Sequence, residues 1–262
     1  MAQFVQQTIE NQRAVVTLCR PDLHNAFNEV VIEELTTAFV ALAKDPAVRV
    51  VVLAGGGKSF CAGADVHWMR RMVNYSLDEN RADADAMAEM LHWIRACTKP
   101  VIARIHGAAI GGGVGLAAAC DLAVAVKTAV FGLTEVKLGI VPAVVSPYVM
   151  EKIGPGHMRR YALTAERFDA IEAKRIGLVS EVFDTPAQMD AWIEDIEAKL
   201  IANGPQAVAA CKQLLREGQD ADWNAKRDLT VRHIAERRVS PEGQEGLNAF
   251  LEKRRPDWSP PK

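Results

Sequence analysis

Short apolar runs of the kind that form strands recur through the first half of the chain, and segments of helical period lie between them. The runs that predict strands are residues 4–9, 14–19, 49–54, 101–105, 122–126 and 130–132. The first two flank the Asn11-Gln12 turn and are expected to pair. Apolar side chains recur at helical spacing in 28–44, where Asn28 is the expected N-cap, and again in 79–97. This succession of strands and helices predicts an α/β fold.

The pattern changes after about Pro186, where the strand-like runs stop. Four segments with helical patterns follow: residues 187–202, 206–217, 221–238 and 242–254. Gly-Pro and Ser-Pro dipeptides at 204–205 and 240–241 punctuate them, as expected of breaks between helices. We therefore predict an α/β core over residues 1–200 and a helical C-terminal region over residues 201–262.

Composition and charge narrow the classes of protein that fit. With 49% hydrophobic and 24% charged residues, the chain is typical of a globular protein, and its net charge of -2 argues against a general nucleic-acid binder. The longest apolar run, residues 107–120, is too short and too rich in glycine to suit a membrane span. No signal peptide is expected, since no basic segment leads into an apolar one. Five scattered cysteines without a Cys-x-x-Cys pair favour a reduced, cytoplasmic protein.

Known cofactor motifs fail at single positions. The segment 55–59 resembles a phosphate loop, but Val52 occupies the place of its first glycine. The cluster 111–115 resembles a dinucleotide-binding turn, but Leu116 occupies the place of its last glycine. No two of the six histidines have the spacing of a helical zinc pair. We therefore expect neither a metal nor an organic cofactor held by the protein.

Two turns of small residues, 60–65 and 111–113, each follow a predicted strand and open toward a helix. Glycine and alanine let another group approach the backbone closely. The first N–H groups of a helix lack partners within it and carry partial positive charge, so two such turns could hold one oxyanion between them. Tight packing of helix on sheet explains the same residues equally well. The pattern alone leaves both interpretations open.

These turns are part of a longer series of motifs, which follow one another along the chain: Phe60-Cys61-Ala62-Gly63-Ala64-Asp65, residues 106–113, Cys120-Asp121-Leu122, residues 134–139 and residues 249–254. In this order they resemble the enoyl-CoA hydratase/isomerase (crotonase) superfamily over nearly the whole chain. The resemblance implies an α/β fold, a spiral of strand–strand–helix turns with a helical C-terminal portion. It also implies an acyl-CoA thioester substrate, whose coenzyme A is part of the substrate rather than a cofactor.

The resemblance carries roles to individual residues. The backbone N–H groups of Ala62 and Gly112 would form an oxyanion hole around the thioester carbonyl, and Glu135 would be the acid or base. For that role we expect burial among apolar neighbours to raise the pKa of Glu135. Ala64 and Asp65 would lie along the CoA moiety.

The resemblance also concerns the C-terminal region and the assembly. Phe250 and Lys253 are similar to family positions that contact CoA, often from a neighbouring subunit. Family members usually form homotrimers, which pair into hexamers. No partner other than substrate and further copies of the chain is expected, and neither nucleic acid nor membrane.

One departure bears directly on the reaction. The typical hydratase has a second glutamate two residues past its triple glycine, and this chain has Gly115 there. Residues 142–149 resemble bacterial methylglutaconyl-CoA and isohexenylglutaconyl-CoA hydratases of leucine and terpene catabolism. We therefore expect a hydratase of branched or carboxylated 2-enoyl-CoA thioesters, in which Gly115 makes room and removes a repelling charge. A Δ3,Δ2-enoyl-CoA isomerase using Glu135 alone and a non-catalytic CoA-thioester binder are the alternatives.

Overall fold

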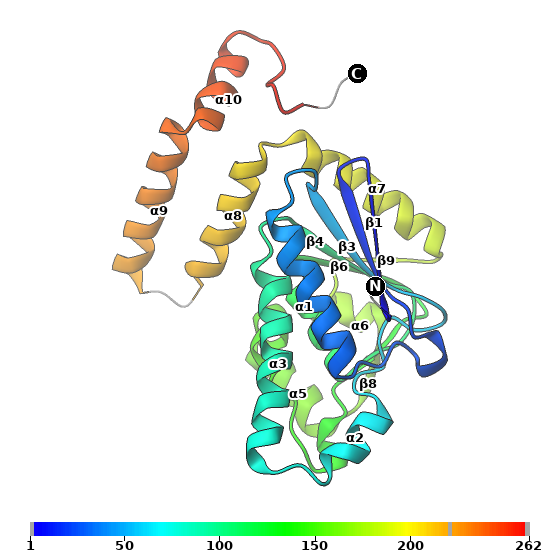
Figure 1. The fold of residues 1–262 in the computed structure, drawn as a ribbon. Coiled ribbons are helices and arrows are strands. Elements are labelled where there is room, and N and C mark those ends of the chain that lie inside the picture. Colours follow the sequence, from blue (N-terminus) through cyan, green and yellow to red (C-terminus); the bar gives the residue numbers. More distant parts are fainter. Residues whose placement is uncertain (1–2, 220–221, 260–262) are drawn as a thin grey trace.

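A six-stranded sheet forms the centre of the computed structural model, which describes all residues except 1–2, 220–221 and 260–262 (Figure 1). Its strands, in spatial order, are β1 (Val5–Glu10), β2 (Arg13–Leu18), β3 (Val50–Gly55), β4 (Val101–Ile105), β6 (Leu122–Val126) and β9 (Glu181–Phe183). β1 and β2 pair antiparallel, and the other neighbours pair parallel. A second, three-stranded sheet contains β5 (Ala109–Ile110), β7 (Val130–Gly132) and β8 (Arg167–Asp169).

Local sequence explains the hairpin and the central strands. Asn11 and Gln12 form the turn between β1 and β2 with φ of 51° and 67°, a left-handed conformation that asparagine tolerates better than most residues. The strands β3 and β4 are almost entirely buried and consist mostly of valine, isoleucine, leucine and alanine. Continuous apolar runs of this kind are typical of parallel strands that are covered on both faces. The six predicted strands are confirmed, whereas β5, β8 and β9 were not predicted.

Helices surround the two sheets. They are α1 (Glu29–Lys44), α2 (Val66–Met72), α3 (Leu77–Ala96), α4 (Gly112–Ala119), α5 (Ser146–Thr164) and α6 (Ala170–Arg175). The predicted cap of α1 is confirmed, since the Asn28 side chain accepts a hydrogen bond from the Val31 N–H at 3.1 Å. Helices α1 and α3 lie side by side (Figure 1). The glycine- and alanine-rich α4 is buried throughout and contacts α3 and α5.

The C-terminal third is helical, as predicted: α7 (Pro186–Ala202), α8 (Pro205–Glu217), α9 (Trp223–Val239) and α10 (Pro241–Leu251). The predicted start of the third of these helices at Ala221 lies outside the described residues. Helix α7 packs against β3, β6 and β9, whereas α8, α9 and α10 form an arm that extends away from the sheet (Figure 1). None of the helices in the described part of the chain is long and apolar enough to cross a membrane.

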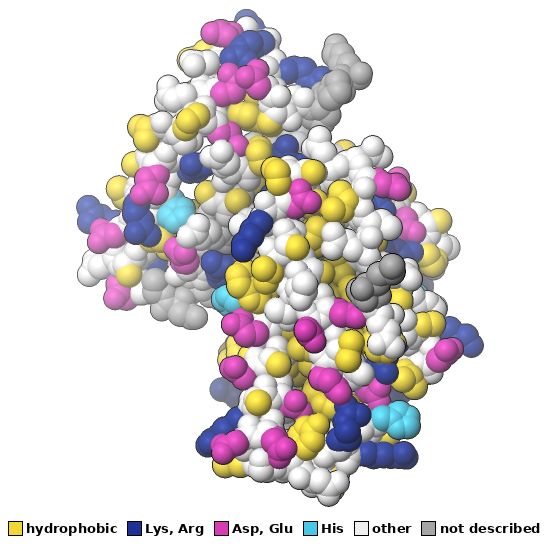
Figure 2. All heavy atoms as spheres, in the orientation of Figure 1, with side chains coloured by type: hydrophobic (Ala, Val, Ile, Leu, Met, Phe, Trp, Pro, Cys, Tyr) yellow, Lys and Arg dark blue, Asp and Glu magenta, His cyan; other side chains and the backbone are white. Residues whose placement is uncertain are grey.

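Large hydrophobic side chains are exposed along this helical arm. They are Leu215, Trp223, Val231, Ile234, Val239, Leu247, Phe250 and Leu251. Figure 2 shows hydrophobic patches on the face of the arm that is in view. One ion pair anchors the arm to the body: Lys212 of α8 donates to the Asp121 carboxylate at 2.6 Å and to the Lys99 carbonyl at 3.0 Å. Apolar surface of this extent on a monomer is typical of a face that another protein surface covers.

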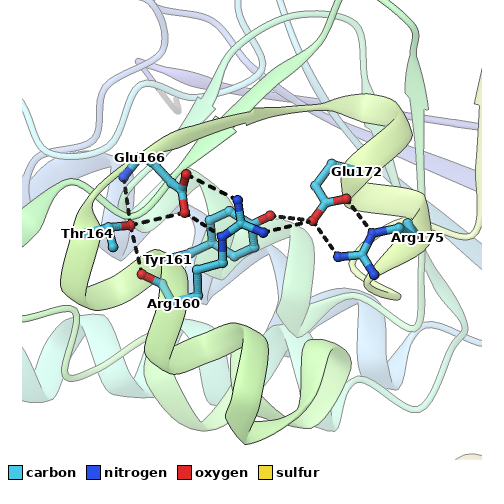
Figure 3. A network of polar contacts seen from close by, with 6 residues as sticks. All are labelled: Arg160, Tyr161, Thr164, Glu166, Glu172 and Arg175. Atoms are coloured by element: carbon cyan, nitrogen blue, oxygen red, sulfur yellow. Dashed lines mark hydrogen bonds and ion pairs between the residues drawn. The ribbon is translucent and has the colours of Figure 1, made fainter.

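A network of charged groups fastens α5 to α6 on another side of the body (Figure 3). The buried Tyr161 donates its hydroxyl hydrogen to Glu172, which also accepts two hydrogen bonds from Arg175, at 2.5 and 2.7 Å. Arg160 pairs with Glu166 at 2.6 Å in the same network. Its residues surround Phe168 of β8, whose ring centroid is 4.2 Å from that of Tyr161. Every charged group in this cluster therefore has a partner.

Candidate active site

A cavity of about 420 Å³ opens between the two glycine/alanine corners and helices α2 and α3. We call it the central cavity. Its lining comes from the segment 62–64, from residues 110–112, from Thr134 and Glu135, and from the segment 138–145, with α2 and α3 completing the wall. Most of these side chains are apolar, as expected of a site that encloses an organic group. The cavity brings together residues that are far apart in the sequence.

Glu135 is the first residue of the short 3₁₀ helix η2 (Glu135–Leu138), which follows β7. Its carboxyl oxygen Oε2 is buried and has no hydrogen-bond partner among the residues that the structure describes. Burial raises the pKa of this carboxyl above its ordinary value, and the backbone N–H groups of Glu135 and Thr134 only partly oppose the rise. The expected rise of the Glu135 pKa is thus confirmed. A raised pKa makes a carboxyl better suited both to accept and to release a proton during a reaction.

The corner 111–113 requires glycine for steric reasons. Gly111 has φ of +55°, and its N–H donates to the Gly132 carbonyl at 2.8 Å. A Cβ on Gly112 would come within 2.1 Å of Phe27 Cζ, and a Cβ on Gly111 would lie 3.1 Å from Glu135 Oε1. Gly112 is the first residue of α4, so its N–H has no acceptor within the helix. This amide therefore points its partial positive charge toward the central cavity.

The two corners meet, and the contact corrects one expectation. A Cβ on Gly63 would lie 3.7 Å from the Gly112 nitrogen. The Ala62 N–H, however, donates to the His24 carbonyl at 3.0 Å, so it is not free to bind an oxyanion. At this corner the Phe27 N–H donates to the Gly63 carbonyl, and the Asp65 N–H donates to the Phe27 carbonyl. These two bonds form a parallel β-bridge around Ala64, whose own N–H therefore points away from Phe27. Within the described residues the Ala64 N–H has no acceptor.

Asp65 does not line the cavity, which contradicts its expected place along CoA. It is only 4% exposed, and its carboxylate pairs with Arg20 at 2.6 Å. The same carboxylate caps α2 by accepting from the His67 N–H at 2.6 Å. Burial alone would raise the pKa of Asp65, but the hydrogen bonds and the Arg20 charge hold it below its ordinary value. Asp65 therefore holds the first corner in place, and its contact with CoA stays a prediction.

Gly115 is also outside the cavity lining, because another side chain fills the space beside it. A Cβ at Gly115 would come within 2.3 Å of Val145 Cγ1 and 2.8 Å of its Cβ. The room that Gly115 leaves is therefore taken by Val145, which does line the cavity. The expectation that Gly115 itself enlarges the substrate site is wrong. Its small size instead allows Val145 to pack there.

Phe250 and Lys253 lie far along the chain at the end of the helical arm, and neither lines the central cavity. The Phe250 side chain is 81% exposed. The structure of one chain does not bring these two residues together with Glu135.

Trp68 and Asp83 line the cavity, although the sequence pattern assigned neither to the site. The Trp68 side chain is only 3% exposed. A signal was present in the sequence, because α2 starts directly after the first corner and one of its faces therefore lies near the same cavity. His67 and Tyr148 are not part of the lining.

Comparisons with known proteins agree with this geometry. The enoyl-CoA hydratase/isomerase family matches residues 8–261. A crotonyl-CoA hydratase from Syntrophomonas wolfei is 34% identical over 251 residues, 95% of each chain. The crystal structure of an enoyl-CoA hydratase from Shewanella pealeana is 40% identical and superimposes with a TM-score of 0.95, covering 98% of this chain and 96% of that one. Pseudomonas aeruginosa AtuE is 35% identical with a TM-score of 0.94, covering 98% and 100%.

Matches of this length and identity settle both the fold and the family. The predicted α/β spiral with its helical C-terminal portion is confirmed by the superposition on crotonase-type crystal structures. The chain belongs to the enoyl-CoA hydratase/isomerase family and is an enzyme of the enoyl-CoA hydratase (hydro-lyase) type.

Proposed function

We propose that this enzyme adds water across the double bond of 2-enoyl-CoA thioesters, with Glu135 as its only acid/base carboxyl group. The observation that carries the proposal is the buried Oε2 of Glu135, without a partner among the described residues, in a cavity lined by two corners that lie against each other. A buried carboxyl oxygen without a hydrogen-bond partner lowers the stability of the fold, and such groups are found mainly at functional sites. A catalytic role is supported because the carboxyl and the free amides line the same cavity.

The free amides of Ala64 and Gly112 are the proposed oxyanion hole. When a nucleophile adds to the β-carbon of an enoyl thioester, negative charge moves to the thioester oxygen and forms an enolate. Preorganised donors in a dry site stabilise such a transition state by about 3 kcal/mol each. The Ala64 amide takes the role that was expected of Ala62, whose N–H is bound to His24.

Glu135 both removes and returns the one proton that the addition moves, and the other hydrogen of water stays on the new hydroxyl group. Its carboxylate removes a proton from water as the water oxygen bonds to the β-carbon, and the enolate forms on the thioester. The protonated Glu135 then returns this proton to the α-carbon, the enolate collapses, and the product is a 3-hydroxyacyl-CoA. A carboxyl with a raised pKa is suited to accept and release a proton in consecutive steps.

The single-carboxylate mechanism is supported by the contact between Gly115 and Val145. A glutamate at position 115 would collide with Val145, so a second carboxylate of the usual hydratase kind has no room here. We expect Gly115→Glu to lower the free energy of unfolding by about 1–3 kcal/mol through overpacking. The double variant Gly115→Glu/Val145→Gly should recover most of this loss in thermal unfolding. Equal stability of Gly115→Glu and the wild type would show that residue 145 does not occupy this space.

The charged side chains that line the central cavity indicate which kind of acyl chain it accepts. Among the described residues, no lysine, arginine or histidine lines the central cavity, whereas Glu135 and Asp83 do. A substrate carboxylate would therefore meet two acidic groups and no counterion. We accordingly propose a branched or unbranched acyl chain without a carboxylate, in place of the methylglutaconyl type of leucine catabolism that the sequence resemblance suggested.

Isomerisation is the second candidate, because one carboxyl group is enough for it. Glu135 could remove a proton from the α-carbon of a 3-enoyl-CoA and return it to the γ-carbon through the same stabilised enolate. The absence of a second carboxylate next to Glu135, whose place beside Gly115 is filled by Val145, favours this candidate as well.

The exposed apolar side chains of the helical arm support self-association. We propose that the chain forms homotrimers or hexamers, in which Phe250 and Lys253 reach the CoA bound to a neighbouring subunit. The mass of the particle in solution, measured by light scattering after gel filtration, tests the assembly. A monomer at micromolar concentration would contradict it.

One assay separates the candidate reactions. The purified enzyme is incubated with crotonyl-CoA, methylglutaconyl-CoA and a 3-enoyl-CoA while the absorbance of the 2-enoyl thioester is followed. Loss of absorbance with crotonyl-CoA is expected of the hydratase, and a gain with the 3-enoyl-CoA is expected of the isomerase. No change with crotonyl-CoA or any longer uncharged 2-enoyl-CoA would overturn the proposed hydration. Faster turnover of methylglutaconyl-CoA than of crotonyl-CoA would overturn the proposal of an uncharged substrate.

A further inference from the structure

Helix α10 ends in a turn that has a lysine where glycine is usual. The Arg254 N–H donates to the Ala249 carbonyl at 2.9 Å, and the Lys253 N–H donates to the Phe250 carbonyl at 3.2 Å. These two bonds define the Schellman motif, in which the first residue past the helix cap is left-handed. That residue is Lys253, with φ of +55°. A residue with a Cβ is strained in this conformation, so a lysine here indicates a role beyond the turn itself.

The helix end alone does not explain this lysine. A positive charge near the last carbonyl groups of a helix is stabilising. Arg254 and Arg255 follow directly and supply such charge, and neither has a positive φ. The strained lysine at position 253 therefore adds a cation that the helix end does not require.

Beyond Lys253 the chain turns back beside α10 and is fastened there (Figure 1). Arg254 forms a bidentate ion pair with Glu245, with nitrogen–oxygen distances of 2.6 and 2.7 Å. The Asp257 N–H donates to the same carboxylate at 3.0 Å. These bonds, that of Arg254 most strongly, lower the pKa of Glu245 to about 2, so the carboxylate stays charged at neutral pH.

An aromatic ring fixes the returning chain a few residues later. The Trp258 ring lies against Gly246 in the middle of α10, where a Cβ would come within 2.9 Å of the Trp258 Cη2 atom. Glycine inside a helix is less stable than alanine, and the ring explains why it is used here. We call Glu245, Arg254 and Trp258 the tail latch. Because Arg254 directly follows Lys253, the tail latch sets the direction in which the Lys253 side chain leaves the backbone.

A lysine held in this way is suited to one kind of ligand. Lys253 is exposed at the end of α10. An ammonium group binds phosphate as a point charge, and a fixed backbone reduces the entropy that is lost on binding. The CoA part of an acyl-CoA thioester carries phosphate groups.

We propose that the tail latch positions the Lys253 ammonium group to bind a phosphate of the CoA that a neighbouring subunit holds. Glu245, Arg254 and Trp258 are then positioning residues, which act on the ligand through Lys253. The proposal rests on the proposed function, in which Lys253 reaches the CoA bound to a neighbouring subunit. It goes further in assigning the phosphate as the group that is bound and the tail latch as the device that aims the lysine.

Two saturated thioesters test this contact without turnover. Butanoyl-CoA carries the phosphates, whereas butanoyl-pantetheine ends before them, and neither can be hydrated. In isothermal titration, Lys253→Gly should bind butanoyl-CoA at least about tenfold more weakly than the wild type, because a charge-assisted hydrogen bond is lost. Its affinity for butanoyl-pantetheine should not change. Glycine also relieves the strain, so the variant should unfold at a temperature equal to or above that of the wild type.

A double variant tests the positioning role. Glu245→Ala opens the tail latch and leaves Lys253 in place, so it should weaken the binding of butanoyl-CoA about threefold or more. In the Lys253→Gly background the same change should have no further effect. Equal losses in both backgrounds would mean that Glu245 does not act through Lys253, and would overturn the positioning role.

Arg255→Ala is the matched control, since it removes an exposed cation from the same segment. Its affinity for butanoyl-CoA should stay within about twofold of the wild type, as expected of an exposed charge without a specific contact. A loss as large as that of Lys253→Gly would mean that the charge of the segment, rather than an aimed lysine, attracts the ligand.

The outcomes distinguish the tail latch from the reaction. An unchanged affinity of Lys253→Gly for butanoyl-CoA would overturn the contact, and so would an equal loss for both thioesters. Hydration of crotonyl-CoA by the wild type is measured alongside. Hydration together with affinities that do not respond to residue 253 would remove only the tail latch. Affinities that respond as expected, without hydration of crotonyl-CoA or any longer uncharged 2-enoyl-CoA, would remove the proposed reaction and leave the phosphate contact.

Discussion

Glu135 and Glu172 have the same side chain in opposite surroundings. Glu172 accepts hydrogen bonds from Arg175 and Tyr161, and these bonds, that of Arg175 most strongly, lower its pKa to about 2. Glu135 has no side-chain partner at all, and burial raises its pKa. In the network of Figure 3 the charges are paired and the groups hold α5 against α6. In the central cavity the Glu135 carboxyl has no charged partner among the described residues.

The paired Glu172 is suited to stabilising the fold, whereas the unpaired Glu135 is suited to proton transfer. A paired carboxylate contributes to stability, but its proton is unavailable near neutral pH. An unpaired carboxyl in an apolar cavity lowers the stability of the folded chain in its ionised form, but it can exchange protons with a substrate. Substitutions of the two glutamates should therefore separate activity from stability.

The largest effect is expected for Glu135→Gln. The change removes the acid/base group and keeps the shape of the side chain, so kcat for hydration should fall by about 10²–10⁴-fold. Because the pKa of Glu135 is higher in the folded chain than in the unfolded chain, its ionisation lowers the free energy of unfolding as the pH rises through the folded pKa. Glutamine avoids this loss, so the variant should unfold at a temperature equal to or above that of the wild type at pH 7. A variant within threefold of wild-type kcat would exclude Glu135 as the acid/base group.

The second effect concerns the corner that faces Glu135. A Cβ introduced by Gly112→Ala would overlap Phe27, so the start of α4 has to shift. The Gly112 N–H would then no longer be placed to donate to the thioester oxygen. Removal of one oxyanion donor costs about 10²–10³-fold in kcat. The double variant Gly112→Ala/Phe27→Leu should regain part of the activity.

Gly156→Ala is the control for Gly112→Ala, because a Cβ at Gly156 meets nothing within 4 Å. Its kcat should match that of the wild type. A Gly112→Ala enzyme as active as this control would show that the amide at position 112 does not bind the oxyanion.

The third effect is the pH dependence of the reaction. Hydration requires the ionised Glu135, and its pKa is raised, so kcat/KM should increase with pH through a midpoint above the ordinary glutamate range. Below that midpoint the rate should fall about tenfold per pH unit. A rate that is constant from pH 5 to pH 8 would contradict a raised pKa for the catalytic base.

The smallest effect is expected for Glu172→Gln. The substitution removes the ion pair with Arg175 and should lower the free energy of unfolding by about 1 kcal/mol at pH 7, with kcat unchanged. The pKa of Glu172 is about 2 in the folded chain and 4.5 as an ordinary glutamate. The ion pair therefore stabilises the fold fully above pH 4.5, and this stabilisation is lost as the pH falls toward 2. The difference in melting temperature between variant and wild type should therefore narrow in acid. A constant difference down to pH 3 would mean that charge is not the cause.

Most of the elements could be predicted because their causes are local. Asn28 caps α1 through a residue three positions away, and Asn11 with Gln12 closes the first hairpin. The short strands β5, β8 and β9 have only two or three residues each and were missed, although β7, which is equally short, was predicted. The two corners and Glu135 could be assigned because each belongs to a motif that the family shares.

The sequence by itself therefore determined the α/β class and the family, and it singled out Glu135 as the proposed acid/base residue, since hydrophobic period, capping and contiguous motifs act over short stretches of chain. Only the tertiary structure decided which amides are free. Ala62 is bound by His24, 38 positions earlier in the numbering, and Val145 fills the space beside Gly115, 30 positions later. Free donors and filled volumes depend on contacts between distant segments, and a linear pattern contains no record of which segments meet.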